Sequence, residues 1–249
     1  MLLQLPEEKR DIIRPLFSKR QPNCSALCCY FNGTMPGKTY VDNLTAPTKA
    51  IIVLDMSWTY VSDNADFPWI EQTLEELCKI TWMQVIWNFA ERPQRPSKGV
   101  EVVIPRFEYT KRSPAVEKTV PVSILPSTDE MFEQCKWKDW HIQTYGSKEN
   151  FMNKTICYYA VEEGHVCSEF EAAFIADGYT EIGIITAEGK RRQGFAYAAC
   201  LRGLEEIEKR GLKPIWACDK DNTGSVKLAE KLGFHSPYEY EFLYYPHRS

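Results

Sequence analysis

The stretch EIGIITAEGKRRQGFA (residues 181–196) determines the fold expected for this chain. Its first six residues have the character of a strand, and its end opens a run with apolar residues at helical spacing. A short basic loop that contains Gly194 joins the two. Free N–H groups at a helix N-terminus point outward, the helix dipole favours negative charge there, and a glycine lets a ligand approach the backbone. The stretch therefore predicts a phosphate-binding loop between a strand and a helix.

The residues that follow strengthen this prediction. From 197 to 210 the apolar side chains form one helical stripe, and Gly211 stands where a left-handed residue commonly ends a helix. Residues 214–218 have the character of a buried strand. After a polar turn, a second helix is expected from about Ser225, ending at KLGF (231–234). The order is strand, loop, helix, strand, helix.

Two motifs in this order resemble those of the GNAT acyltransferases. They are Arg191-x-x-Gly194-x-Ala196, for the family's (Gln/Arg)-x-x-Gly-x-(Gly/Ala) loop, and Asn222…Ser225…Lys231-Leu232-Gly233-Phe234, for its downstream Asn…Leu-Gly-Phe segment. The resemblance covers roughly residues 115–249. This part is also similar to the GNAT subgroup that includes the zwittermicin-type antibiotic self-resistance acetyltransferases. The resemblance implies an α+β (mixed α/β) fold in which helices flank a mixed sheet.

The resemblance also implies an activity. GNAT enzymes transfer an acyl group from acyl-CoA to an amine, so we expect an N-acetyltransferase that moves an acetyl group from acetyl-CoA to a primary amine of a small molecule. Two alternatives stay open at this point. One is a non-catalytic acyl-CoA-binding or regulatory module that keeps the fold, and the other is an enzyme that acetylates a protein lysine or N-terminus.

The expected site for acetyl-CoA follows from the same resemblance. The pyrophosphate would lie on the backbone N–H groups of 192–196, and the pantetheine arm would lie where the strands 181–186 and 214–218 separate. Asn222 and Ser225 would contact the cofactor or hold the loop, although Asn also favours helix caps and turns. The residues expected to contact acetyl-CoA are Ile184, Ile185, Thr186, Arg191, Arg192, Gln193, Gly194, Phe195, Ala196, Asn222 and Ser225.

An amine must be neutral to attack a thioester, so a general base is useful. The resemblance implies Glu181, which stands where family members often place a catalytic glutamate. Glu169 and Glu171 are expected on the neighbouring strand, and their spacing of two places both on one face. Each of these two is otherwise an ordinary surface charge.

One position departs from the family pattern. Many relatives carry a tyrosine four residues before the glycine of Leu-Gly-Phe, where it protonates the leaving thiolate. This chain has Ala229 there. The proton would then come from Tyr238, Tyr240 or water, or the chemistry would be slow or altered.

Composition excludes several classes of protein. The chain has 249 residues, a formal net charge of −4 and a pI near 5.7, which argues against a dedicated nucleic-acid binder. No run of 18 apolar residues predicts a membrane span, and no signal peptide is recognised, so we expect a cytoplasmic protein. The nine cysteines are expected to be buried thiols, and the four dispersed histidines predict no metal site.

Residues 1–112 exceed what a GNAT fold needs, so we expect an additional N-terminal α/β domain before a GNAT domain at 113–249. The strand pair expected around 43–48 is similar to the later hairpins, which makes this domain either a degenerate second copy of the fold or a substrate-side domain. Its expected helices are 6–18 and 67–80, and its expected strands are 25–31, 38–41, 50–61, 85–87 and 100–109.

The elements of the second domain are expected in the GNAT order. Strands are expected at 119–125, 156–161, 165–175, 181–186, 214–218 and 238–245, a helix start at 127–130, and a helical or loop segment at 137–151. Turn residues at 162–164 and 176–179 predict two hairpins. The oligomeric state cannot be read from these patterns.

Overall fold

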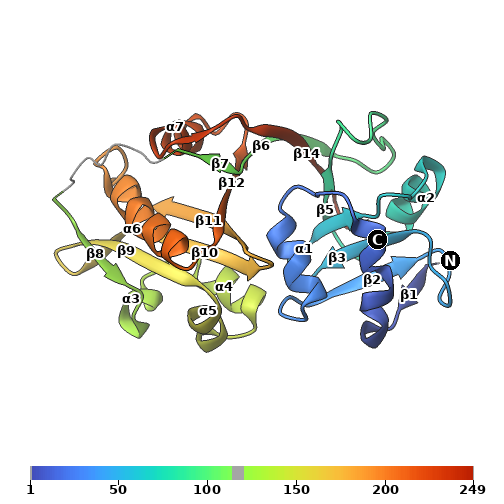
Figure 1. Cartoon of the computed structure of the whole chain (residues 1–249), viewed down its shortest axis with the longest axis horizontal. Coiled ribbons are helices and arrows are strands. Elements are labelled where there is room, and N and C mark those ends of the chain that lie inside the picture. The colour runs from blue at the N-terminus through green and yellow to red at the C-terminus, as the bar shows by residue number, and fades with distance from the viewer. Residues whose placement is uncertain (1, 114–120, 249) are drawn as a thin grey trace. The chain divides into compact units, whose positions relative to one another are not determined.

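The computed structural model describes residues 2–113 and 121–248. The chain divides into two compact units (Figure 1). The first unit contains the chain up to Phe107, the short segment Asp219–Asp221 and the chain from Tyr238 onward, and the second contains Glu108–Cys218 and Asn222–Pro237. The last strand thus returns to the first unit. It does so because its residues from Glu241 to Tyr245 pair with a strand of that unit.

The second unit is built on five strands in the order β12-β11-β10-β9-β8. These strands are β8 Ser123–Pro126, β9 Ile156–Glu162, β10 His165–Ala176, β11 Tyr179–Thr186 and β12 Lys213–Asp219. Its helices are α3 Asp129–Glu133, α4 Lys138–Tyr145, α5 Lys148–Lys154, α6 Phe195–Lys209 and α7 Thr223–Lys231. The short strands β7 Lys111–Arg112 and β13 Phe234–His235 pair with each other. The mixed sheet with flanking helices is the predicted fold class, and part of the strand expected at 119–125 lies outside the described residues.

Turn chemistry sets both hairpins of this sheet. Glu163 and Gly164 have φ values of 50° and 80°, and Asp177 and Gly178 have 49° and 79°. Two successive residues with positive φ favour the right-handed twist of paired strands. The turns predicted at 162–164 and 176–179 are therefore confirmed, and β9, β10 and β11 follow one another as antiparallel neighbours.

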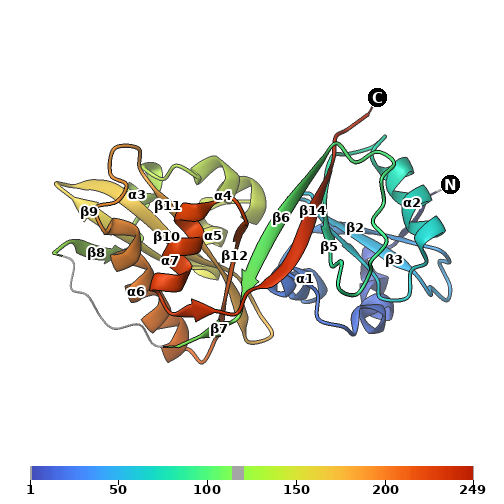
Figure 2. The ribbon, with the colours of Figure 1, turned by 90° about the horizontal axis from the view of Figure 1, so that it is seen from above.

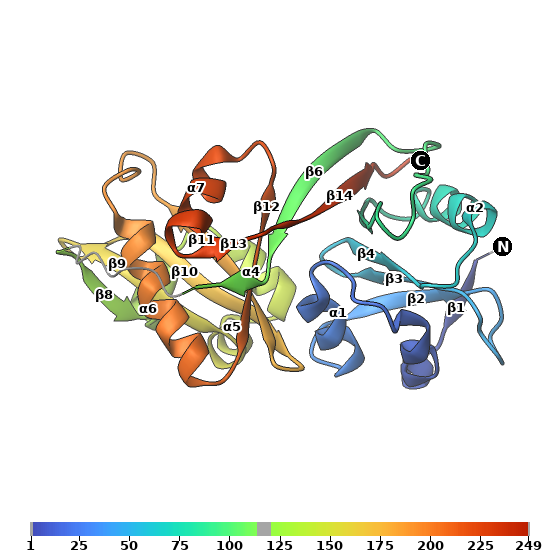
Figure 3. The same cartoon turned by 45° about the horizontal axis from the view of Figure 1, so that its top comes forward.

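Helices cover the two faces of this sheet (Figures 1 and 3). On one face, α6 approaches β10 so closely that a Cβ atom at Gly203 would lie 2.0 Å from the Phe170 ring. On the other face, α4 and α5 pack against the same strand, with His141 of α4 beside Glu171. Successive residues of β10 therefore face different helices, Phe170 toward α6 and Glu171 toward α4.

The first unit contains a sheet in the order β1-β2-β3-β4-β5-β14-β6. Its strands are β1 Leu3–Leu5, β2 Gly37–Val41, β3 Ala50–Leu54, β4 Trp58–Val61, β5 Met83–Trp87, β6 Val102–Tyr109 and β14 Tyr238–Tyr245. Its helices are the 3-10 helix η1 Glu7–Phe17 and the α-helices α1 Cys24–Phe31 and α2 Phe67–Leu77. The strands β6 and β14 run side by side (Figure 2).

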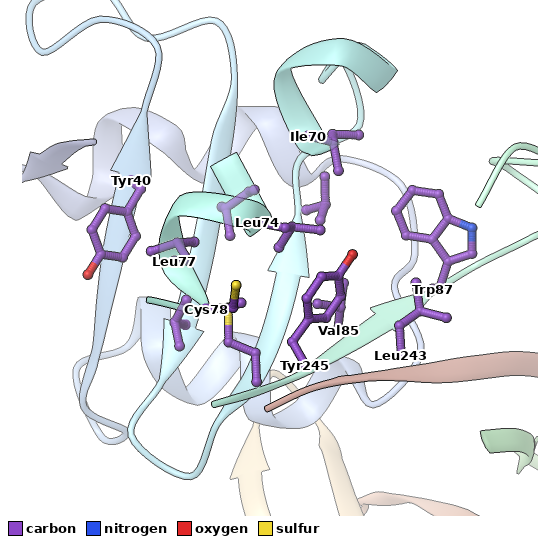
Figure 4. Close-up of a cluster of buried hydrophobic side chains, with 13 residues drawn as sticks. Tyr40, Ile70, Leu74, Leu77, Cys78, Val85, Trp87, Leu243 and Tyr245 are labelled. Carbon is purple, nitrogen blue, oxygen red and sulfur yellow. The ribbon is translucent and has the colours of Figure 1, made fainter. Parts of the chain in front are cut away.

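The core of the first unit lies between α2 and the sheet (Figure 4). Leu74 and Leu77 of α2 meet Val85 of β5 and Tyr245 of β14, and all four side chains are fully buried. The last strand therefore supplies part of this core, which explains why it belongs to the first unit.

Two expectations for the first unit were wrong. Residues 25–31 form α1 rather than a strand, because a short, uniformly apolar run fits a helix buried on most sides as well as a strand. The run 50–61 is two strands, β3 and β4, because Ser57 adopts a φ of 73° and turns the chain. The helix expected at 6–18 is present as η1.

The two units share one order of elements. In the first, β1 to β4 are antiparallel neighbours, α2 follows, and β5 then lies parallel to β4. In the second, β8 to β11 are antiparallel neighbours, α6 follows, and β12 lies parallel to β11. Helices separate the first strand from the second in both.

Candidate functional site

The strands β11 and β12 are paired over only part of their length. Their parallel register runs from Tyr179 opposite Lys213 to Glu181 opposite Ile215. On its other edge, β11 stays paired with β10 as far as Thr186. Among the described residues, the second half of β11 therefore has a strand neighbour on one side only. Its peptide groups on the β12 side can pair with an extended ligand that carries amides.

The helix α6 begins beyond the open end of β11. Gly194 is its N-cap residue and has a φ of 93°, and no side chain caps the helix. Phe195 and Ala196 lie in its first turn, two residues earlier than the sequence predicts. The first N–H groups of an α-helix have no acceptor within the helix, so this end favours an anion.

The basic loop before α6 is exposed. Arg191, Arg192 and Gln193 are all solvent-accessible, and Arg192 adopts a φ of 63°. The Gln193 side chain donates a hydrogen bond of 3.0 Å to the carbonyl oxygen of Gly189, which folds the loop back on itself. Two exposed arginines therefore directly precede the open helix end, and their guanidinium groups can add charge to a phosphate site.

Asn222 and Ser225 have structural partners at the start of α7. The Asn222 Oδ1 atom accepts a hydrogen bond of 3.1 Å from the Ser225 backbone, which makes Asn222 the helix N-cap. The Ser225 hydroxyl accepts a hydrogen bond of 3.1 Å from the Trp216 indole. These contacts favour the role of holding the loop over direct contact with the cofactor.

Three glutamates share the sheet face that α4 and α5 cover. Glu169 and Glu171 are two positions apart on β10, so their side chains lie on the same face. Glu181 of β11 lies opposite Ala173 of β10, which shares that face. Glu181 is 8% exposed and stands at the last paired position before β12 separates. Glu169 accepts a hydrogen bond of 2.8 Å from the Lys136 backbone. Of the three, Glu181 is the one on β11 itself, at the residue after which β11 and β12 are no longer paired.

Sequence reasoning missed one residue of this face. His141 on α4 is 3% exposed, its Nδ1 atom lies 3.3 Å from Oε2 of Glu171, and its ring stacks on Phe151 at 4.0 Å. Burial lowers the pKa of His141 to about 4. Burial, and then the charges of Glu169 and Glu181, raises the pKa of Glu171 to about 8. Although the distance is that of an ion pair, both shifts favour the uncharged forms.

Position 229, where many relatives carry a tyrosine, has no room for one. Ala229 is fully buried in α7, so no larger side chain fits there without rearrangement. Tyr240 is also fully buried, and its hydroxyl accepts a hydrogen bond of 2.8 Å from Arg106. Tyr238 donates to the amide oxygen of Asn88. Both tyrosines belong to the first unit and have partners within it.

The loop of the first unit that corresponds to the loop before α6 is built differently. Asp66 is the N-cap residue of α2, its carboxylate accepts a hydrogen bond of 3.1 Å from Trp69, and it pairs with Lys49. Pro68 follows in the first turn. A carboxylate already occupies this helix end, so it repels a phosphate. Within the described residues, the open helix N-terminus after a fourth strand is therefore found in the second unit alone.

The comparison with known families settles the family. A sequence model of the GNAT acetyltransferase family matches residues 14–243. The chain belongs to the GNAT acetyltransferase family. It is therefore an acetyl-CoA-dependent acyltransferase, and the resemblance inferred from the two motifs is confirmed.

The relatives cover nearly all of the chain. An uncharacterized N-acetyltransferase of Bacillus subtilis (strain 168), YdfB, is 24% identical over 98% of both chains. A GCN5-related N-acetyltransferase-like protein from Streptococcus suis superposes with a TM-score of 0.66 at 19% identity, over 95% of this chain and 98% of the other. A tandem GNAT protein from the clavulanic acid biosynthesis pathway superposes with a TM-score of 0.60 at 11% identity, over 98% of both chains. The two structures show the shared fold.

Within residues 2–113 and 121–248, no group of three or more His, Cys, Asp or Glu side chains could hold a metal ion. The same residues include no helix that is both long and apolar enough to span a bilayer.

Proposed function

We propose that the protein transfers the acetyl group of acetyl-CoA to the primary amine of a small molecule, at a site on the second unit. One observation carries the proposal: β11 loses its β12 neighbour just after Glu181, and the same strand leads to the open N-terminus of α6. A carboxylate, a strand edge without a β12 neighbour and a helix end that favours anions thus follow one another along the chain from β11 to α6.

From β11 to α6, successive segments of the chain suit successive parts of acetyl-CoA. The free edge of Ile184, Ile185 and Thr186 would pair with the pantetheine amides, and the N–H groups at Gly194 to Ala196 would hold the pyrophosphate. Arg191 and Arg192 would add charge. Asn222 and Ser225 would keep the β12–α7 loop in shape.

Acetyl-CoA supplies an activated thioester. The amine nitrogen attacks its carbonyl carbon, the carbon–sulfur bond breaks, and the amine loses a proton. We assign that proton to the carboxylate of Glu181, because it is the carboxylate at the point where the strands part. The sulfur leaves as a thiolate and takes its proton from water, since Ala229 offers no donor.

The first unit is proposed to be a GNAT-like copy that does not bind acetyl-CoA. Its shared order of elements and its Asp66-capped helix support this reading. The superposition over 98% of a protein described as a tandem GNAT supports it as well. One acetyl-CoA per chain is the expected stoichiometry.

The alternative function is a non-catalytic acyl-CoA-binding module, which the buried Ala229 favours. A protein acceptor is a second alternative for the same chemistry. Binding of acetyl-CoA without acetylation of any amine would identify the non-catalytic module. Acetylation of peptides but of no small amine would identify the protein acceptor.

Calorimetric titration of acetyl-CoA tests the proposal. We expect binding in the micromolar range with one site per chain, and loss of binding in Gly194→Glu, which places a negative side chain at the helix end. Gly178→Glu is the matched control, because Gly178 also has a positive φ but lies at the other end of β11. The control should bind acetyl-CoA with native affinity. Equal affinity of Gly194→Glu and the native protein would refute the proposed cofactor site.

An amine screen then tests turnover. Polyamines, amino sugars, amino acids and lysine peptides are offered with acetyl-CoA, and free thiol is measured. We expect acetylation of at least one small amine, and loss of at least a hundredfold in rate in Glu181→Gln with acetyl-CoA affinity retained. Acetyl-CoA binding with no turnover on any amine would favour the non-catalytic module.

A further inference from the structure

The sheet face of the second unit that α4 and α5 cover carries two buried polar atoms that lie close to each other. Nδ1 of His141 and Oε2 of Glu171 lie 3.3 Å apart, and neither has a hydrogen-bond partner among the described residues. His141 is 3% exposed and Glu171 is 6% exposed. Buried polar atoms are rarely left unsatisfied in native proteins. A single proton between the two atoms would satisfy both.

The surroundings show which of the three glutamates keeps a proton. Burial raises the pKa of Glu169, but its carboxylate also accepts a hydrogen bond of 2.8 Å from the N–H of Lys136, which stabilises the charged form and which Glu171 lacks. The charges that act on Glu171 are those of Glu169 and Glu181, and both are negative. Like charges on one buried face cannot all ionise without a large cost. Glu171 is therefore the carboxyl that binds the proton.

The remaining titratable groups do not change this outcome. Among the described residues, the titratable groups that face Glu169 and Glu171 from the packed elements are Cys135, Cys157, Tyr159 and His141, with exposed Lys136 beside Glu169. Burial raises the pKa of the Cys135 thiol to about 12, and it also raises the pKa values of Cys157 and Tyr159. Burial keeps His141 neutral. These four groups add no charge near Glu171 at neutral pH.

The position of His141 is fixed by packing. Its ring stacks on Phe151 at 4.0 Å with an interplanar angle of 21°, and Trp140 lies edge-on at 5.3 Å. Gly183, opposite Glu171, leaves the space into which the carboxyl group extends. Both partners are thus held in place by neighbours that have no role in chemistry.

We propose that Glu171 is a positioning residue for acetyl transfer: it holds a proton against Nδ1 of His141, and this neutral pair leaves Glu181 as the ionised carboxylate that accepts the proton of the amine. The inference rests on the proposed function for its catalytic consequence, because Glu181 is the base only if the site transfers an acetyl group. The placement of the proton can be tested on the protein alone.

Infrared difference spectroscopy of the native protein and Glu171→Gln tests the placement. We expect the native protein at pH 7 to show the C=O band of a protonated carboxylic acid, and the variant to lose it. The matched control is Glu163→Gln, at an exposed hairpin turn, which should leave the band in place. A native spectrum at pH 7 that shows no acid band sensitive to Glu171→Gln would overturn the proposal.

The pH dependence of kcat/KM tests the consequence, with n-butylamine as a minimal primary amine. His141→Phe keeps the stacking on Phe151 but removes the acceptor, so the shared proton moves toward Glu181 and the acid limb of the profile shifts to higher pH. Adding Glu171→Gln to His141→Phe removes the shared proton and should return the limb toward its native position. An acid limb that does not move in His141→Phe, or that stays shifted in the double variant, would contradict the proposal.

The two proposals fail in distinguishable ways. Absence of acetyl transfer by the native protein, with the acid band present, refutes the proposed function and the catalytic consequence while confirming where the proton lies. Active native protein without the acid band refutes the positioning role and leaves the proposed function standing.

Discussion

Gly183 leaves the space that the side chain of Glu171 occupies on the neighbouring strand. The two residues face each other across β10 and β11, and a Cβ atom at position 183 would lie 2.4 Å from Oε1 and 2.7 Å from Cγ of Glu171. Such separations are shorter than non-bonded atoms tolerate in a packed interior. A glycine on β11 is therefore a condition for a buried glutamate on β10.

Gly183→Ala should destabilise the protein by about 1–3 kcal/mol, because the added methyl group forces Glu171 or the sheet to move. Urea unfolding measures the change. Gly224→Ala is the control, because its Cβ would meet only the Asn222 side chain at an ordinary 3.6 Å, within a helix where alanine is favoured. Adding Glu171→Ala to Gly183→Ala should recover part of the loss. No loss in Gly183→Ala would show that the glutamate does not need this space.

Gly203→Ala should also destabilise the protein, although alanine is the better helix former by about 1 kcal/mol. A Cβ atom at 203 would lie 2.0 Å from Cε1 of the fully buried Phe170 ring, so α6 would be pushed away from β10. We expect a net loss of about 1–3 kcal/mol in urea unfolding. Phe170→Leu combined with Gly203→Ala should cost less than the sum of the two single changes. Strict additivity would argue against contact between these two side chains.

Much of the second unit could be predicted from the sequence because its signals are local. The hairpin turns at 162–164 and 176–179 contain the residues that positive φ demands, and the Gly194 loop joins a strand to a helix in chain order. The two family motifs lie in the same half of the chain. Local chemistry and fold agree there, so the sequence predicts the sheet and the loop before α6 on which the proposed site rests.

The features that could not be predicted depend on contacts between distant segments. His141 is a lone histidine in a short helix, and only its proximity to Glu171, thirty positions along the chain, gives it a role. The apolar run 25–31 has no period that separates a helix from a strand. The pairing of β14 with β5 joins residues 154 to 162 positions apart, which no turn signal encodes.

Asn222 should act as a helix cap rather than as a cofactor ligand. Asn222→Ala removes the acceptor for the Ser225 N–H and should cost about 1 kcal/mol of stability, whereas Asn222→Ser retains an acceptor and should cost little. Both variants should bind acetyl-CoA within about twofold of native affinity by calorimetry, since a cap of this strength holds the loop without touching the ligand. A large loss of affinity in the stable Asn222→Ser variant would instead assign Asn222 to the cofactor.

Glu171→Gln should change how stability depends on pH. The pKa of Glu171 is raised from 4.5 to about 8, first by burial, so the native protein binds this proton more tightly than the unfolded chain. The stability that this proton contributes is fully present below pH 4.5 and is lost as the pH rises through 8. Glutamine does not titrate. The variant should therefore gain stability relative to the native protein across this window, on the order of 4 kcal/mol by its upper end.

Urea unfolding at several pH values from 4 to 9 measures this difference. His141, whose pKa is lowered from 6.5 to about 4, makes both proteins less stable as the pH falls through that range, so its effect largely cancels in the comparison. Glu163→Gln, exposed in its hairpin turn, should give a difference that does not depend on pH. A flat difference for Glu171→Gln as well would mean that Glu171 is ionised in the folded protein, and the proton would have to be sought on Glu169 or Glu181.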